Sequence, residues 1–248
     1  PDIVEGNDLP DFNPDDEYLQ EIKSPIFYAV QKNINIQTGQ PTILDFDMQR
    51  ISQRINIVFN IRTEGNIKRE DLAAPIIELS GACGRFNIAD ACLDTTRLYR
   101  MAHQVQPDEF TQTGEGTYRC VVHFHTLGVI PSAAKGHLNG PGILQVALQV
   151  STPQLDSSGA PVVDEEGNPV KNSRYIYGAI NPYDELTAAQ LIEVRDGKIY
   201  LRYSKEDVNI EITTPLVIKA DQIVPNDTGM GWQPHDPTNP DDDIIIEI

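Results

Sequence analysis

The chain has 248 residues, 40% of them hydrophobic, and its 37 Asp and Glu against 19 Lys and Arg give a formal net charge of −18. This length suits one large β-sandwich or two small β domains, and the hydrophobic fraction excludes disorder along the whole chain. The negative charge repels phosphate backbones and anionic headgroups, which argues against binding to nucleic acid or to a membrane surface. No apolar run is long enough to span a bilayer.

The first part of the chain, residues 1–24, is acidic and rich in turn-forming residues, as in Asp8–Asp11 and Asn13–Asp16. Such a composition predicts a linker. The opening segment Pro1–Gly6 is typical of the middle of a longer chain, so we expect a further domain before this one.

Residues 25–224 carry the two-residue period of half-buried strands. Along Arg54–Arg62, the side chains of Ile55, Ile57, Phe59 and Ile61 alternate with polar ones. Comparable alternation predicts further strands within Tyr118–Phe124, Leu144–Val150, Ile199–Tyr203 and Val208–Ile212, and shorter ones at Ile34 and Ile36, Ile77 and Leu79, Tyr175 and Tyr177, and Leu216 and Ile218.

Glycine-rich turns such as Thr113–Gly116 separate these segments, a pattern typical of antiparallel sheets. One helix is predicted over Glu185–Val194, with Asp184 as its cap and Gly197 beyond its end. The polar segment Ser157–Asn172 predicts a protruding hairpin or long loop. The fold class that follows is an all-β, antiparallel β-sandwich with one short crossover helix.

The last segment, residues 225–248, is predicted to be a Pro- and Asp-rich tail that ends in a short strand. This strand has two possible positions: it closes the sheet of its own chain, or it completes the sheet of a partner chain. The candidate partner-strand residues are Ile244, Ile245, Ile246, Glu247 and Ile248.

Three cysteines, at 83, 92 and 120, are too few for a disulfide framework. Cys83 and Cys92 are near enough in sequence to close a short loop, and the alternative is that all three are buried and reduced. The single tryptophan, Trp232, is either a sugar-stacking platform or a plug at the base of the sandwich.

No phosphate-binding loop, dinucleotide glycine pattern or hydrolase motif occurs. The best metal candidates are His123 and His125, which share one face of a strand, although no third ligand is evident and two solvated histidines are the alternative. The acidic run Asp241–Asp243 lacks the spacing of a calcium loop. We therefore predict a protein that is not an enzyme and has neither a cofactor nor a metal.

Three segments resemble the fimbrillin-like lipoproteins of Bacteroidales, a group that includes minor fimbrial anchor proteins and a related domain of unknown function. Ile76–Ile88 is similar to their "LSG-x-x-G-x-x-x-L" strand–turn–strand. Pro25–Ala29, followed by Thr42–Met48, resembles the start of their C-terminal domain, and His125–Pro131 resembles a strand end. The resemblance covers residues 25–224.

The resemblance implies a transthyretin-like β-sandwich in an outer-membrane lipoprotein that faces the cell exterior. It also implies a role in fimbria assembly or adhesion, with other fimbrial subunits as partners joined by strand addition, and a host or glycan ligand. The lipid-anchor motif of the family is absent from these residues, and Cys83 and Cys92 occupy positions where the family has small or polar residues. A cell-surface carbohydrate-binding module of a glycan-uptake system is the alternative function.

Overall fold

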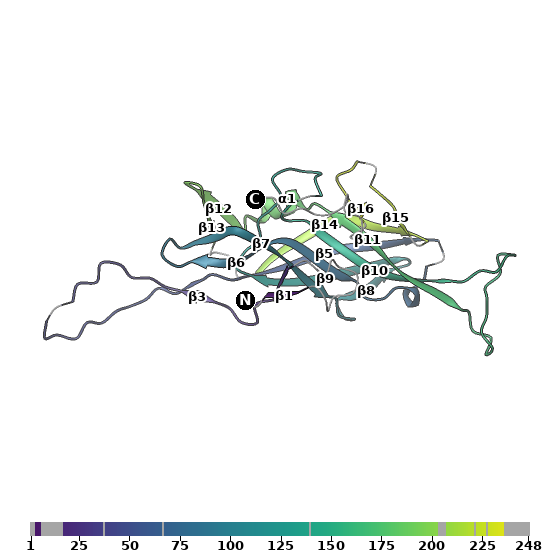
Figure 1. Ribbon diagram of the computed structural model, residues 1–248, viewed down its shortest axis with the longest axis horizontal. Helices are drawn as coiled ribbons and strands as arrows, with labels where there is room; N and C mark the ends of the chain where they lie inside the picture. Colours follow the sequence, from purple (N-terminus) through teal and green to yellow (C-terminus); the bar gives the residue numbers. More distant parts are fainter. Residues whose placement is uncertain are drawn as a thin grey trace.

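The computed structural model describes residues 3–5, 17–36, 38–65, 67–138, 140–202, 207–220, 222–226 and 228–235 (Figure 1). The larger sheet of this part of the chain has the order β1–β2–β7–β6–β10–β11–β16, with β13 beside β7 and β12 beside β13. Its strands are β1 (Ile3–Glu5), β2 (Glu17–Leu19), β6 (Ile76–Asn87), β7 (Cys92–Gln104), β10 (Leu144–Pro153), β11 (Lys171–Ile180), β12 (Ile192–Arg195), β13 (Lys198–Leu201) and β16 (Gln233–Pro234).

The smaller sheet has the order β15–β14–β5–β9–β8. Its strands are β5 (Gln53–Glu64), β8 (Phe110–Gly114), β9 (Thr117–Thr126), β14 (Asp207–Lys219) and β15 (Gln222–Ile223). A separate pair, β3 (Phe27–Tyr28) with β4 (Gln49–Arg50), lies outside both sheets. The helical segments are α1 (Tyr183–Ala189) and the short 3₁₀ turn η2 (Arg69–Asp71).

The two sheets pack face to face over one core, and the alternating residues supply it. Ile55, Ile57, Phe59 and Ile61 of β5 are completely buried against side chains of the opposite sheet. Each such side chain contributes about 1.5–3 kcal/mol by leaving water. The core members of the opposite sheet include Ile77, Leu79, Tyr99, Met101, Val146, Leu148 and Ile176.

The predicted all-β, antiparallel sandwich is confirmed. Two pairings nevertheless run parallel: β14 lies parallel to β5, and β2 lies parallel to β7. The parallel pairing is possible because β14 is far from β5 in sequence, so no short turn forces the two strands to run in opposite directions.

Two predicted boundaries differ from the structure. Tyr18 and Leu19 in β2 are buried, and the Tyr18 hydroxyl donates a hydrogen bond to Glu78. Residues 17–19 therefore belong to the larger sheet and not to a linker, because their apolar side chains have a sheet to pack on. Trp232 is also in the core, and β16 pairs with β11, so the sandwich extends beyond residue 224 into the predicted tail.

The predicted helix is correct only in its first half. α1 ends at Ala189, where Gln190 adopts a left-handed conformation with φ of 51°, and Ile192–Arg195 forms β12. The Asp196-Gly197 turn joins β12 to β13 in a hairpin. The β-branched residues Ile192 and Val194 favour this strand, and Ile192 packs against the core.

Two segments project from opposite ends of the sandwich (Figure 1). The connection between β10 and β11 extends to the right of the view, which confirms the predicted protruding hairpin over most of Ser157–Asn172. The segment between β3 and β4 extends to the left. The strand predicted at Ile34 and Ile36 is wrong, because both residues lie in this projection outside regular structure and are exposed.

Candidate functional site

Residues 27–50 form an extended arm that leaves the sandwich through β3 and returns through β4 (Figure 1). A turn near the far end includes Gly39, whose φ of 82° is a conformation that glycine adopts without strain. No other atoms lie near this glycine that would forbid a side chain. Its role is therefore to reverse the chain at the tip of the arm.

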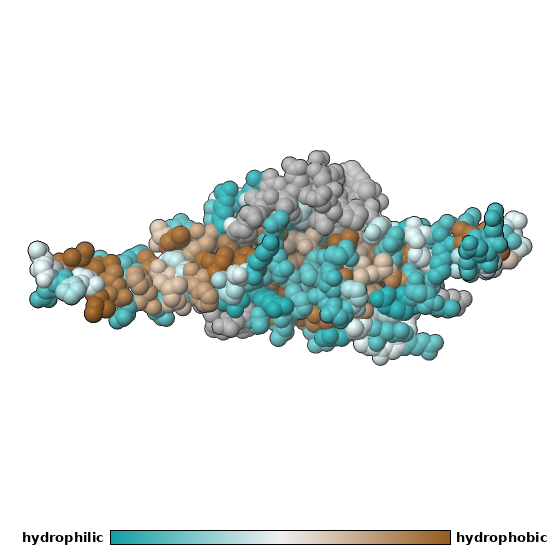
Figure 2. Space-filling model, turned by 90° about the horizontal axis from the view of Figure 1, so that it is seen from below, coloured by the Kyte–Doolittle hydropathy of each residue, from teal (hydrophilic) through white to brown (hydrophobic). Residues whose placement is uncertain are grey.

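The arm gathers most of the exposed apolar surface of the described chain. Eight of the fourteen large hydrophobic side chains that are exposed there lie between Phe27 and Met48, with exposed fractions from 37% to 84%. Figure 2 shows apolar surface along the left end of the molecule, which is the arm. Soluble proteins seldom expose apolar groups in such a concentration unless a partner covers them. The eight are Phe27, Val30, Ile34, Ile36, Ile43, Leu44, Phe46 and Met48.

Beyond the β3–β4 pair, the described backbone of the arm has no strand partner. Among the described residues, no backbone–backbone hydrogen bond joins residues 29–36 or 41–48 to any other segment. A lipid environment does not suit such a segment, since unsatisfied amides and carbonyls are costly in hydrocarbon. The open edge of a β-sheet suits it, because such an edge offers the missing hydrogen bonds and apolar contacts together.

The base of the arm is firmly attached to the sandwich. Tyr28 is buried, its ring packs edge-on against Phe86 at 5.4 Å between centroids, and its hydroxyl donates a 3.0 Å hydrogen bond to the carbonyl of Ile88. The amide of Ile51 donates to the carbonyl of Ile26 at 2.8 Å. The base of the arm is therefore held to the body at Tyr28 and Ile51.

An open sheet edge occurs on the same chain, at β14. Residues Asp207–Ile212 pair with β5 on one side, and among the described strands only β15 pairs with the other side, at Ile218 and Lys219. Beside the open part lies a groove of about 550 Å³ between β14 and α1. Its lining residues are Glu185, Ala188 and Ala189 of α1 and Asp207, Val208, Asn209, Ile210 and Glu211 of β14.

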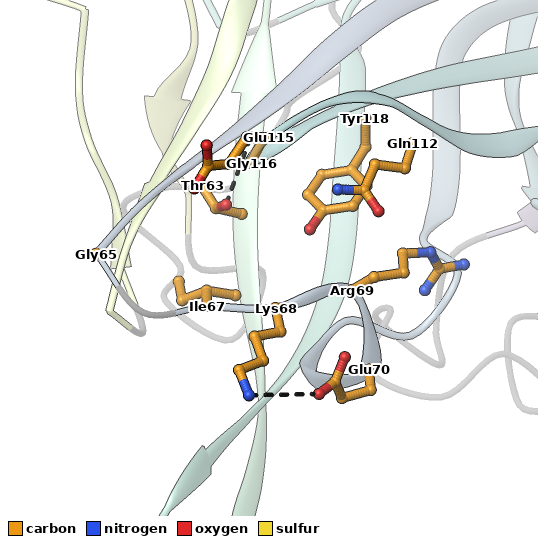
Figure 3. A pocket seen from close by; sticks show the side chains of 10 residues that line it. All are labelled: Thr63, Gly65, Ile67, Lys68, Arg69, Glu70, Gln112, Glu115, Gly116 and Tyr118. Carbon is orange, nitrogen blue, oxygen red and sulfur yellow. Dashed lines mark hydrogen bonds and ion pairs between the residues drawn. The ribbon is translucent and has the colours of Figure 1, made fainter.

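A second cavity, of about 750 Å³, lies where the loop after β5 meets the β8–β9 turn (Figure 3). Three of its charged side chains have partners: Lys68 faces Glu70 at 3.8 Å, and the Arg69 guanidinium lies 4.5 Å from the ring centre of Phe110. Burial raises the pKa of the Tyr118 hydroxyl. The described lining residues include no histidine or cysteine, so this cavity brings no such nucleophile or base into reach of a ligand.

The two candidate metal ligands do not converge on one point. His123 Nδ1 lies 2.7 Å from Asn56 Oδ1, whereas His125 is buried with its Nε2 at 3.0 Å from Ser52 Oγ. Neither is a solvated surface histidine. Glu109 lies 2.9 Å from His103 Nε2 and 3.6 Å from His123 Nε2. Within the described residues, no group of three or more His, Cys, Asp or Glu is arranged to hold a metal ion.

The remaining candidate residues have structural roles. Trp232 is 1% exposed, lies 5.1 Å from the Phe59 ring, and donates its indole N–H to the carbonyl of Thr214 at 3.0 Å. The plug interpretation is confirmed, and Trp232 as a sugar platform is wrong because neither ring face is accessible. All three cysteines are buried and free. Cys83 and Cys92 therefore do not form the short-loop disulfide, and the prediction of buried, reduced cysteines is confirmed.

The candidate partner strand Ile244–Ile248 lies outside the described residues. The arm was not identified from sequence as a site, because its alternating apolar residues are equally typical of a buried strand. One feature of the sequence could have identified the arm. Pro25–Met48 contains many apolar residues, and these gather at Ile34–Ile36 and Ile43–Met48. A polar, turn-forming stretch separates the two groups, which is the pattern of a chain that goes out and returns.

Neither a protein-family model, nor a curated protein, nor a solved structure matches this chain. No helix in the described part of the chain has the length and apolar character needed to cross a membrane. The described residues form an all-β sandwich with two unusual features: an exposed apolar arm, and a stretch of β14 that pairs on one side only.

Proposed function

We propose that this chain is a non-catalytic structural or assembly subunit of a bacterial surface appendage, and that it joins neighbouring subunits through the arm. The observation that carries the proposal is the combination of exposed apolar side chains with a backbone that, in the described residues 29–36 and 41–48, makes no backbone hydrogen bond to another segment. Strand addition satisfies both at once, since main-chain hydrogen bonds supply affinity and alternate side chains supply register.

The energetics favour association. Apolar surface that leaves water contributes about 25 cal/mol per Å², so covering the eight exposed side chains of the arm supplies a substantial driving force. The fixed base at Tyr28 adds to it, because an anchored segment loses less conformational freedom on binding than a free one.

The resemblance of Ile76–Ile88 and His125–Pro131 to fimbrillin-like lipoproteins supports the choice of appendage. On this basis we propose a transthyretin-like topology, a position on the outer face of the outer membrane, and attachment through a lipid anchor carried by a preceding segment. Other fimbrial subunits are the proposed partners, and adhesion to a host or glycan ligand is a further role of the assembled structure.

The alternative function, a carbohydrate-binding module, requires an exposed aromatic ring, and Trp232 was the candidate. Trp232 is in the core, where it cannot stack on a sugar ring. Structural assembly is therefore the function that the geometry supports best.

Sedimentation equilibrium tests the proposal. The protein is expected to associate with increasing concentration, and the double variant Ile34→Asp/Ile36→Asp is expected to remain monomeric because charges replace exposed apolar side chains of the arm. Leu155→Asp/Val163→Asp is the matched control: these residues are similarly exposed, but they lie on the β10–β11 hairpin. The control is expected to associate as the unmodified protein does.

Two results would overturn the proposal. One is an unmodified protein that stays monomeric at roughly 100 µM, a concentration at which micromolar affinities are easily seen. The other is association of the arm variant as strong as that of the control. Because all four substituted side chains are exposed, circular dichroism and thermal melting should be unchanged in both variants.

A further inference from the structure

We infer that the groove between β14 and α1 accepts the arm segment Val30–Ile36 of a second copy of this chain, so that copies join head to tail. The inference rests on the proposed function and names the acceptor and the partner.

The edge of β14 has the right geometry for an added strand. The open stretch Asp207–Ile212 is six residues long and belongs to a strand that β5 holds in place on its other side. The segment Val30–Ile36 is seven residues long, so the two match in length and both fall in the usual range for strands. The small side chains of Ala188 and Ala189 leave the groove open above this edge.

Charge distinguishes the two flanks of the arm. Three carboxylates line the groove, from Glu185, Asp207 and Glu211. The flank Val30–Ile36 contains one cation, Lys32, and no acid, whereas the flank Ile43–Met48 contains two aspartates and no cation. Electrostatic complementarity therefore selects the first flank, and like charges disfavour the second.

The side-chain pattern agrees with this choice. Asn33 has a φ of 59° in the free arm, so it must become extended when the arm binds. In that extended conformation Val30, Lys32, Ile34 and Ile36 share one face, and the polar residues between them share the other. When the first face points toward α1, Val30 and Ile34 contact the two alanines, and Lys32 reaches Glu185. The polar face then points to solvent beside the exposed side chains of β14.

The occupant belongs to another molecule because the arm points away from its own groove. In Figure 1 the arm extends from the left end of the body, whereas α1 and β14 lie over the middle of the sandwich. Donor and acceptor are thus different surfaces of one chain. Contacts of this heterologous kind produce an open-ended row of subunits unless the geometry closes into a ring.

Thiol cross-linking tests the acceptor. One copy carries Asn33→Cys at the centre of the arm segment, and the other carries Asn209→Cys at the centre of the open edge of β14. A short bis-maleimide tolerates a slip of one register position, and the native cysteines do not interfere because all are buried. Thr111→Cys on β8, an exposed position at the opposite edge of the same sheet, is the matched control.

A covalent dimer is expected from Asn33→Cys mixed with Asn209→Cys and not from Asn33→Cys mixed with Thr111→Cys. No dimer at position 209, or equal yields at both positions, overturns the acceptor assignment. If sedimentation still shows arm-dependent association in that case, the proposed function stands and only the acceptor is wrong. If association itself is absent, both fail.

Charge reversal supplies a second, independent measurement. Lys32→Glu is expected to weaken self-association roughly tenfold, and adding Glu185→Lys to the same chain is expected to restore most of it, because Glu185 is the groove carboxylate that Lys32 reaches. Lys23→Glu, an exposed substitution off the arm, is the control and should leave association unchanged. A Lys32→Glu/Glu185→Lys protein that associates no better than Lys32→Glu alone excludes this groove.

Discussion

The hydroxyl of Tyr28 donates a hydrogen bond to the carbonyl oxygen of Ile88, 3.0 Å away, and this bond joins the base of the arm to the turn after β6. The two residues are far apart in sequence, so the contact holds the arm to the larger sheet.

Replacement of Tyr28 by Phe removes this bond and keeps the ring. We expect a loss of about 1 kcal/mol in unfolding free energy, and faster amide hydrogen exchange than in the unmodified protein at the hydrogen-bonded base of the arm, in β3, β4 and Ile51. Phe86→Leu, which removes the ring partner and keeps the hydroxyl bond, is the comparison. Unchanged exchange in the arm of Tyr28→Phe would show that the bond does not hold its base.

Trp232→Ala is expected to destabilise the sandwich by about 3–5 kcal/mol, because it empties a large fully buried site against Phe59. Trp232→Phe fills part of the site but loses the N–H bond to Thr214, so a smaller loss is expected. Chemical denaturation measures both. A near-neutral Trp232→Ala would mean that the side chain is not part of the core.

Stability is expected to fall as the pH drops below 6.5. Burial lowers the pKa of both His123 and His125 below that ordinary value, so each stays neutral in the folded protein while the unfolded chain takes up a proton. The unfolded state then binds more protons, and stability rises with pH through this window and is fully present above 6.5. Urea unfolding at a series of pH values measures the slope.

The charged groups around His123 oppose one another: Arg54 and His103 lower its pKa, and Glu109 and Glu21 raise it. His123→Gln/His125→Asn is expected to flatten the pH dependence of stability between the folded pKa values and 6.5. A double variant with the same slope as the unmodified protein would assign the effect to other groups.

The cysteines are expected to resist alkylation in the folded protein. Burial raises the pKa of Cys83 to about 12, and burial also raises that of Cys120, so the reactive thiolate is scarce at neutral pH. Labelling with iodoacetamide should therefore follow unfolding and accelerate in denaturant. Rapid native labelling of Cys83 or Cys120, located by peptide mapping, would contradict the burial.

Periodicity predicted the interior of the sandwich well. The alternation in β5, β9 and β14 assigned the buried faces correctly, because a two-residue period can be read locally. The same reasoning failed at Ile34 and Ile36, where an alternating segment is exposed on the arm. Alternation is also insufficient in β10, where the polar side chain of Gln145 is buried, because the pattern does not say whether a second layer covers the other face.

Hydrophobic alternation in the chain by itself determined the fold class and the membership of most of the core, since these depend on neighbours in sequence. Only the tertiary structure decided that no described segment covers the apolar residues of the arm, that β14 pairs parallel to β5 and leaves Asp207–Ile212 without a second described strand, and that Trp232 is a plug. Those properties depend on which distant segments meet, and side-chain pattern along one strand carries no information about its neighbours in space.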